Sequence, residues 1–134
     1  MTGFDLLLTC LALNVYKEAR GEPDIGQMAV ALVTINRARN RFDGDVCKAV
    51  FQDKQFSWTI TDVENGVLLP SKRPNRKSES WLKATEIARM ALTMKDFTGG
   101  ANHYHATYVS PAWVKNLELV GKWGDHIFYK EKRK

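Results

Sequence analysis

A long apolar segment that ends abruptly constrains the fold of this chain more than any other feature of its sequence. Residues 4–15 are helix-forming and apolar on nearly every side, which is typical of a helix buried in the middle of a domain. Gly21 and Pro23 predict its end, because glycine suits the left-handed position beyond a helix and proline cannot continue one. We therefore expect a domain built around this helix.

Glu18 falls in the last turn of the predicted helix, on the same face as Leu11 and Asn14. The partial negative charge of a helix C-terminus disfavours an anion by about 0.3–1 kcal/mol. Apolar neighbours add a desolvation cost, and both effects raise the pKa of a carboxyl. A carboxyl that stays protonated near neutral pH can act as a general acid. The alternative is an ion pair with Lys17, Arg20 or another cation.

The rest of the chain predicts a mainly helical α+β domain. Helices are expected over residues 24–41 and 45–51, and another follows Ser78 and stops before residues 98–100. Asp24 and Gln27 fit a capping box at the start of the second helix. Residues 62–77 are expected to form a long loop. Residues 101–106 and 123–129 predict two strands that pair as a small antiparallel sheet.

Length and charge limit what this chain can be. Its 134 residues suffice for one domain with one core, and we expect a single domain over residues 1–134. The net charge of +5 favours anionic partners, and the basic residues gather at 37–41, 72–77 and 130–134. The sequence contains no run of 18 apolar residues, so no membrane span is predicted. The N-terminus lacks the pattern of a secretory signal. We therefore expect synthesis in a cytoplasm.

The two cysteines and three histidines allow several kinds of chemistry. Cys10 is expected to be a buried free thiol, although two cysteines alone leave a disulfide with Cys47 open. His103 and His105 share one side of a predicted strand, and His126 lies on its partner. Three histidines on one sheet face could bind zinc, but the usual zinc spacings are absent. Hydrogen bonding is the favoured role for them.

Aromatic residues lie in or near three segments of the sequence: the one around Glu18, residues 55–58 and residues 103–105. Sugar rings stack on aromatic side chains, and ligand clefts combine such apolar surfaces with a few polar groups. This grouping favours a carbohydrate ligand. The aromatic residues concerned are Tyr16, Phe56, Trp58, Tyr104, Tyr108 and Trp113.

At this point the chain resembles a known family. The Glu-Ala-Arg-Gly-Glu run at residues 18–22 is followed by a block at residues 26–37, and both are similar to the start of cell wall hydrolases of the spore cortex-lytic enzyme type. Later blocks at residues 47–58, 101–105, 111–113 and 126–129 match that family in the same order. The resemblance covers residues 11–129, nearly the whole chain.

The resemblance implies a lysozyme-like, lytic transglycosylase-like helical domain that acts on the glycan strands of peptidoglycan. The bond cut would be the β-1,4 link from N-acetylmuramic acid to N-acetylglucosamine. Glu18 would be the catalytic acid and Glu22 a possible second acid or base, without metal or cofactor. The residues expected to bind the substrate are Tyr16, Gln55, Phe56, Ser57, Trp58, His103, Tyr104 and His105.

The basic, single-domain character resembles a phage endolysin. Such a protein would be a monomer made in the host cytoplasm that acts on the wall, with its basic tail at residues 130–134 touching an anionic envelope. Two other interpretations remain. One is a nucleic-acid-binding module that uses residues 37–41 and 72–77, and the other is a zinc-dependent amidase or peptidase that uses the histidines. We expect peptidoglycan, and no nucleic acid, as the partner.

Overall fold

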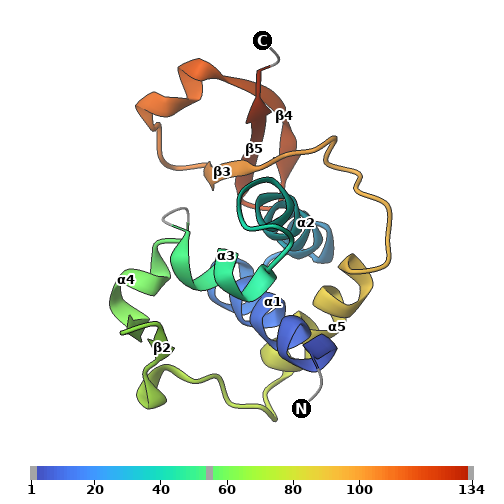
Figure 1. Ribbon diagram of the computed structural model, residues 1–134. Coiled ribbons are helices and arrows are strands. Elements are labelled where there is room, and N and C mark those ends of the chain that lie inside the picture. The colour runs from blue at the N-terminus through green and yellow to red at the C-terminus, as the bar shows by residue number, and fades with distance from the viewer. Residues whose placement is uncertain (1–2, 54–55, 133–134) are drawn as a thin grey trace.

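Helix α1 (Gly3–Ala19) lies in the middle of a group of helices, as the apolar segment predicts (Figure 1). The computed structural model describes residues 3–53 and 56–132. Helices α2 (Asp24–Arg41), α3 (Val46–Gln52) and α5 (Glu79–Ala91) all contact α1. The side chains of Leu11, Ala12 and Val15 are completely buried between them. Gly21 has φ of 84°, so it ends α1 in the left-handed conformation that was expected.

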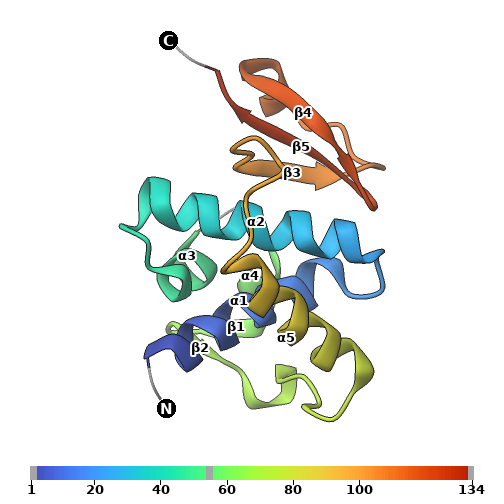
Figure 2. The same ribbon diagram turned by 90° about the vertical axis from the view of Figure 1, so that its right-hand side faces the viewer.

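Helix α2 separates the helical layer from a small sheet (Figure 2). One side of α2, with Met28 and Leu32, packs into the core around α1. Its other side, with Val30 and Val33, packs against the sheet in a second core that contains Phe128. Helix α2 is therefore buried on two faces, and its contacts on both sides fix the position of the sheet relative to α1.

The predicted capping box at the start of α2 is wrong. Pro23 occupies the N-cap position, and Asp24 is the first helical residue. The Asp24 carboxylate instead pairs with Lys83 of α5 at 3.3 Å, and the Gln27 side chain donates to the backbone carbonyl of Glu22. Proline at this position leaves no side-chain oxygen to accept from the first turn.

The C-terminal part forms a three-stranded antiparallel sheet in the order β3-β5-β4. Strands β3 (His103–Ala106) and β5 (His126–Glu131) pair as the sequence predicts. Strand β4 (Leu117–Trp123) was not predicted, and the turn that joins it to β5 lies inside the segment expected to be one strand. Its pairing with β5 shifts register between Leu119 and Gly121, which leaves an extra residue on β4.

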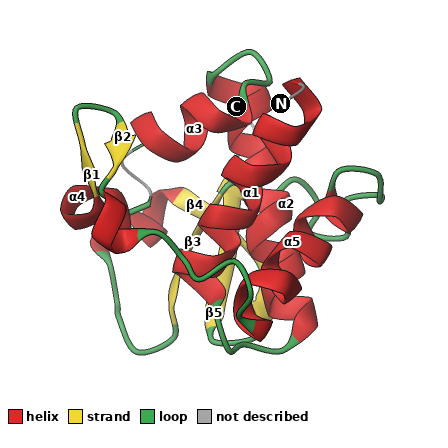
Figure 3. Ribbon diagram, turned by 90° about the horizontal axis from the view of Figure 1, so that it is seen from below, coloured by secondary structure: helices red, strands yellow, loops and turns green. Residues whose placement is uncertain are grey.

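The connections contain more structure than the sequence indicates (Figure 3). The segment expected to be a long loop holds the short hairpin of β1 (Val63–Glu64) and β2 (Val67–Leu68), preceded by α4 (Trp58–Asp62). Two short 3₁₀ helices span Pro70–Lys72 and Ala112–Asn116. Ser78 caps α5 by accepting from the backbone of Trp81, as predicted, although α5 ends earlier than expected.

None of the helices in the described ranges combines the length and the apolar character needed to cross a membrane. Helix α1 is apolar, but it has only 17 residues, and its buried side chains begin at Leu8. These side chains form the core, whereas Phe4 and Leu6 in the first turn are exposed.

Cys10 and Cys47 form a disulfide that joins α1 to α3, with 5.1 Å between their Cα atoms. The expectation of a free thiol at Cys10 is wrong. The sequence left the pairing open because it does not show on which side of α1 the third helix packs. In the structure the two helices contact each other, and the cysteine side chains meet at that contact.

Reduction of this disulfide is expected to lower the free energy of unfolding by about 2–4 kcal/mol, because the bond closes a loop across a separation of 37 residues. Urea unfolding with and without dithiothreitol measures the change. A Cys10→Ser, Cys47→Ser variant is the control, and its free energy of unfolding should be the same with and without dithiothreitol. Equal stability of the oxidised and reduced wild type would contradict the expectation.

Candidate functional site

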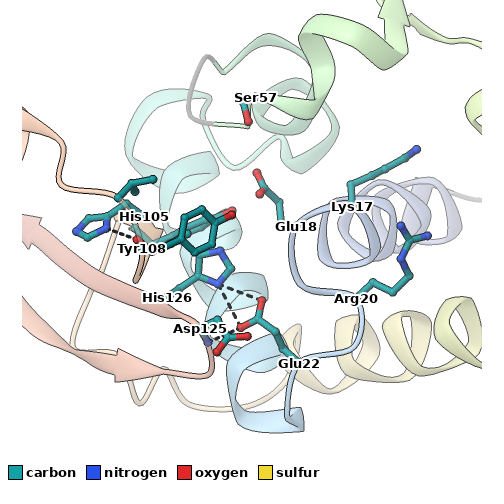
Figure 4. A pocket seen from close by; sticks show the side chains of 12 residues that line it. Lys17, Glu18, Arg20, Glu22, Ser57, His105, Tyr108, Asp125 and His126 are labelled. Carbon is teal, nitrogen blue, oxygen red and sulfur yellow. Dashed lines mark hydrogen bonds and ion pairs between the residues drawn. The ribbon is translucent and has the colours of Figure 1, made fainter.

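A cleft of about 510 Å³ opens where the end of α1 faces the sheet (Figure 4). One wall comes from the end of α1 and the residues that follow it, and the other from β3, the loop after it and the start of β5. The residues that line this cleft are Lys17, Glu18, Arg20, Glu22, Ser57, Tyr104, His105, Ala106, Tyr108, Val109, Asp125 and His126.

Glu18 lies between the two walls, and its carboxyl group points into the cleft (Figure 4). Burial raises the pKa of Glu18 from its ordinary 4.5 to about 7; the Tyr104 hydroxyl opposes this rise, and the nearby Glu22 carboxylate adds to it. The sequence argument gave this direction, and the structure shows that burial is the main cause. A half-buried carboxyl with this pKa can donate a proton near neutral pH and take it back afterwards.

Neither Lys17 nor Arg20, the two nearby cations that could have paired with Glu18, forms an ion pair with it. Lys17 forms an ion pair with Asp62 at 2.7 Å and donates to the backbone carbonyl of Lys72 at 2.8 Å. The Arg20 guanidinium lies over the ring of Tyr16. Neither side chain therefore lowers the pKa of Glu18 through an ion pair, and the alternative role proposed for Glu18 is not supported.

Of the aromatic residues expected to bind substrate, Phe56 belongs to the core and Trp58, which is half-buried, packs against it. Phe56 is completely buried next to Tyr104, so it cannot contact a ligand. The indole nitrogen of Trp58 donates to the side chain of Asn14 at 2.8 Å, and Asn14 donates to Thr34 at 2.9 Å. These hydrogen bonds anchor α4 against α1 and α2 under the cleft. Aromatic content alone did not separate such supporting residues from a binding surface.

The other predicted binding residues divide between the cleft and its surroundings. Ser57, Tyr104 and His105 line the cleft. Tyr16 lies outside it and stacks under Arg20, and His103 packs against Trp113. Gln55 lies outside the described residues.

The three histidines do not share one sheet face. His103 and His105 both contact Trp113, whereas His126 faces Tyr104 and Phe128 on the other side of the sheet. Among residues 3–53 and 56–132, no group of three or more His, Cys, Asp or Glu side chains is placed to hold a metal ion. The shared histidine face that a zinc site would need therefore does not form, because β5 pairs with β3 in a register that turns His126 inward.

Glu22 fixes the turn between β4 and β5 against the end of α1. Its Oε1 atom accepts from the backbone of Asp125 at 2.8 Å, and its Oε2 atom lies 3.1 Å from Nδ1 of His126. Gly124 has φ of 63°, which disfavours other residues, and a Cβ atom there would lie 2.4 Å from Oε1 of Glu22, so a side chain at this position would displace the Glu22 carboxylate. Glu22 therefore holds the sheet in place beside Glu18.

Arg37 is not part of a basic surface, as the sequence suggested. It is buried, and it donates to both carboxylate oxygens of Asp53, one of them at 2.8 Å, and to the backbone carbonyl of Asn102. Arg37 thereby ties α2 to the end of α3 and to the residue before β3. The nucleic-acid interpretation loses one of its proposed contacts.

Asp125, His126 and Val109 were missed as cleft residues, and Tyr108 was identified only as one of the aromatic residues that favour a carbohydrate ligand. They come from the last third of the chain and meet Glu18 only through the packing of the sheet on α2. The carboxylate of Glu22 and the histidine in the second predicted strand were the available signal, because a carboxylate can accept a hydrogen bond from an imidazole ring. This signal does not specify the register of the strands, so it could not locate the turn between β4 and β5.

Comparison with known proteins gives a consistent result. The Cell Wall Hydrolase family model matches residues 21–129. The spore cortex-lytic enzyme of Halalkalibacterium halodurans is 32% identical over 124 residues, which cover 88% of this chain and 33% of the relative. That of Bacillus subtilis is 33% identical over 88% of this chain and 35% of the relative. The chain thus spans about a third of the length of these two relatives.

Two solved structures resemble the fold described above. The catalytic domain of the Bacillus cereus SleB protein has a TM-score of 0.71 and 28% identity, covering 94% of this chain and 91% of that one. The catalytic domain of the germination-specific lytic transglycosylase SleB from Bacillus anthracis has a TM-score of 0.69 and 28% identity, covering 97% of each chain. The similarity therefore extends over both the helical layer and the sheet.

Proposed function

Because the chain belongs to the cell wall hydrolase family, we propose that it cleaves peptidoglycan glycan strands, with Glu18 as the catalytic acid. The bond cut is the β-1,4 link from N-acetylmuramic acid to N-acetylglucosamine. The observation that carries the proposal is a carboxyl group with a pKa of about 7 inside an open cleft. The similarity to a catalytic domain described as a lytic transglycosylase supports the same reaction type.

The proposed reaction uses one carboxyl group twice. Glu18 donates its proton to the glycosidic oxygen as the bond from that oxygen to the anomeric carbon breaks. Positive charge develops on the muramic acid ring, and its own 6-hydroxyl attacks the anomeric carbon. The Glu18 carboxylate takes the hydroxyl proton, which restores the acid and leaves a 1,6-anhydro ring. No water is consumed, and a pKa near 7 suits both proton transfers.

The surroundings of Glu22 favour this route over hydrolysis. Hydrolysing glycosidases use a second carboxylate about 5–9.5 Å from the first, as nucleophile or base. Glu22 is the candidate, but the backbone of Asp125 and the ring of His126 occupy its oxygens. A carboxylate held in this way is poorly placed to activate a water molecule. Glu22 as a second acid or base remains the alternative, and the products distinguish the two.

Digestion of purified peptidoglycan followed by mass spectrometry of the fragments tests the proposal. Anhydromuramic ends are expected, with the same yield in a chelator. Reducing muramic ends would mean hydrolysis and would return Glu22 to the position of base. Intact glycan with cut peptides, or activity that a chelator removes, would overturn the proposal in favour of the amidase interpretation.

The pH dependence of the rate follows from the raised pKa of Glu18. The protonated carboxyl is the active form, and it loses its proton as the pH rises through about 7. The ratio kcat/KM is therefore expected to fall tenfold for each pH unit above about 7, because it reports ionisation of the free enzyme. Initial rates on a soluble glycan fragment between pH 5 and 9 measure this. A rate that rises steadily to pH 9 would contradict it.

We also propose that the protein acts as an endolysin in host lysis, made in the cytoplasm and reaching the wall through a membrane lesion. The net charge of +5 supports contact with an anionic envelope. Expression in bacteria should leave cells intact until the membrane is permeabilised, and lysis should then follow. Lysis without permeabilisation, or no lysis after it, would contradict this role.

A further inference from the structure

We infer that Arg20 binds a carboxylate of the substrate at the rim of the cleft, and that this contact selects N-acetylmuramic acid on the α1 side of Glu18. The inference rests on the proposed function, since it names the part of a peptidoglycan strand that this wall of the cleft recognises.

Among the described residues that line the cleft, Arg20 is a basic residue that forms no ion pair with a carboxylate. Of the two basic side chains in that wall, Lys17 is already held by Asp62 and by the carbonyl of Lys72. Arg20 is exposed, and its contacts are with the hydroxyl group and the ring of Tyr16. Its charge therefore remains available to a ligand.

The contacts of Arg20 also fix its orientation. Its guanidinium carbon lies 4.4 Å from the centre of the Tyr16 ring, and its Nη1 atom donates to the Tyr16 hydroxyl. The Tyr16 ring is in turn held edge-on by the buried Trp81, with 6.0 Å between their ring centres. A guanidinium has five N–H donors. One hydrogen bond to Tyr16 therefore leaves enough donors for a bidentate contact with a carboxylate.

The position of Arg20 relative to Glu18 gives this contact a direction. Figure 4 shows Arg20 and Lys17 on one side of Glu18, and Tyr108 and His126 on the other. Beside the β4–β5 turn, Asp125 and the Glu22 carboxylate that accepts from its backbone would repel an anion. A carboxylate on the bound strand is therefore favoured on the α1 side and disfavoured near the β4–β5 turn.

The chemistry of peptidoglycan supplies this carboxylate on one of its two sugars only. N-acetylmuramic acid carries a lactyl ether whose carboxyl group is either free or joined to a peptide that has carboxylates of its own. N-acetylglucosamine has none. A cation fixed on one side of the catalytic acid can therefore set which sugar lies there, and with it the direction in which the strand is bound.

Calorimetric binding of glycan strands to Glu18→Gln, with and without Arg20→Gln, tests the inference without cleavage. Three strands are compared: peptide-bearing strands, strands stripped to the free lactyl carboxylate, and stripped strands whose lactyl group is converted to the methylamide. Arg20→Gln is expected to weaken binding about 5- to 10-fold where the recognised carboxylate is present, and less than 2-fold on the methylamide. The strand affected identifies the lactyl or the peptide carboxylate.

Arg89→Gln on the exposed part of α5 is the matched control, and it should bind all three strands like the parent. Arg20→Lys keeps the charge without the planar geometry and should lose part of the affinity. Equal effects of Arg20→Gln on all three strands, or no effect on any, would overturn the inference alone. A parent that binds no strand would overturn it together with the proposed function. A parent that binds normally while the wild type cleaves nothing would overturn only the proposed function.

Discussion

Glu18→Gln is expected to lower kcat/KM for glycan cleavage by about 10³-fold or more. Glutamine fills the same space but cannot donate a proton to the glycosidic oxygen or remove one from the 6-hydroxyl, and general acid–base catalysis contributes about 10²–10⁴-fold. The same assay as for the wild type measures the change, with the release of anhydromuramic ends as the readout. The binding of the strand should change little, because Glu18 acts on the reacting atoms.

The stability of the same variant provides the control for folding. Glu18 has a higher pKa in the folded chain, about 7 against 4.5, so the folded state holds more protons than the unfolded state between these values. The wild type therefore loses stability as the pH rises through this window, and glutamine does not titrate. Above pH 7 we expect Glu18→Gln to be more stable than the wild type by about 1–3 kcal/mol, a range that allows for partial exposure.

These two measurements together separate catalysis from folding. An inactive variant that is also unfolded would not identify Glu18 as the acid, but an inactive variant that is more stable at pH 8 would. Full activity in Glu18→Gln would contradict the proposed mechanism. The search for the acid would then begin with Asp125, which lines the same cleft.

Arg37→Met is expected to lower the free energy of unfolding by about 3–5 kcal/mol. Removing one partner of a buried ion pair leaves the other charge buried without compensation. Here the guanidinium contacts Asp53 through two nitrogens, and it also holds the carbonyl of Asn102 next to β3. Urea unfolding measures the loss. Because Asn102 directly precedes the strand that carries Tyr104 and His105, cleavage should weaken as well.

Two further variants make this result specific. Arg39→Met lies on the exposed side of the same helix and should change stability by less than about 0.5 kcal/mol. The double variant Arg37→Met, Asp53→Asn removes both charges and should recover part of the loss, because no ion is then buried alone. A loss in Arg37→Met no larger than that in Arg39→Met would show that the ion pair does not stabilise the fold.

Local sequence signals predicted the helical layer well. The apolar run of α1, the glycine and proline after it and the serine cap of α5 act through nearby residues, so the sequence shows them directly. The turn at Gly124 was missed because it lies within residues 123–129, which were expected to be one strand; only the last residue of β4, Trp123, falls in that segment. The disulfide and the burial of Arg37 were missed because both depend on which helices pack together.

The candidate site divides in the same way. The direction of the Glu18 pKa shift could be predicted from the end of its helix and its apolar neighbours, and the family resemblance predicted its role; in the structure, burial is the main cause of the shift. The opposite wall could not be predicted, since Asp125 and His126 reach Glu22 across more than a hundred residues of chain. Phe56 and Trp58 show that aromatic content alone does not identify binding residues. Both were expected to bind substrate, but Phe56 is completely buried and Trp58 donates a hydrogen bond to Asn14.

The irregular pairing of β4 has a consequence for how copies of this protein meet. Strand β4 is at the edge of its sheet, and edge strands can act as templates on which another chain adds a strand. The extra residue between Leu119 and Gly121 bends the row of free backbone groups, and Glu118 and Lys122 place opposite charges along it. Although Leu119 is exposed, the bulge and these charges therefore disfavour the addition of a strand from another copy at this edge of the sheet.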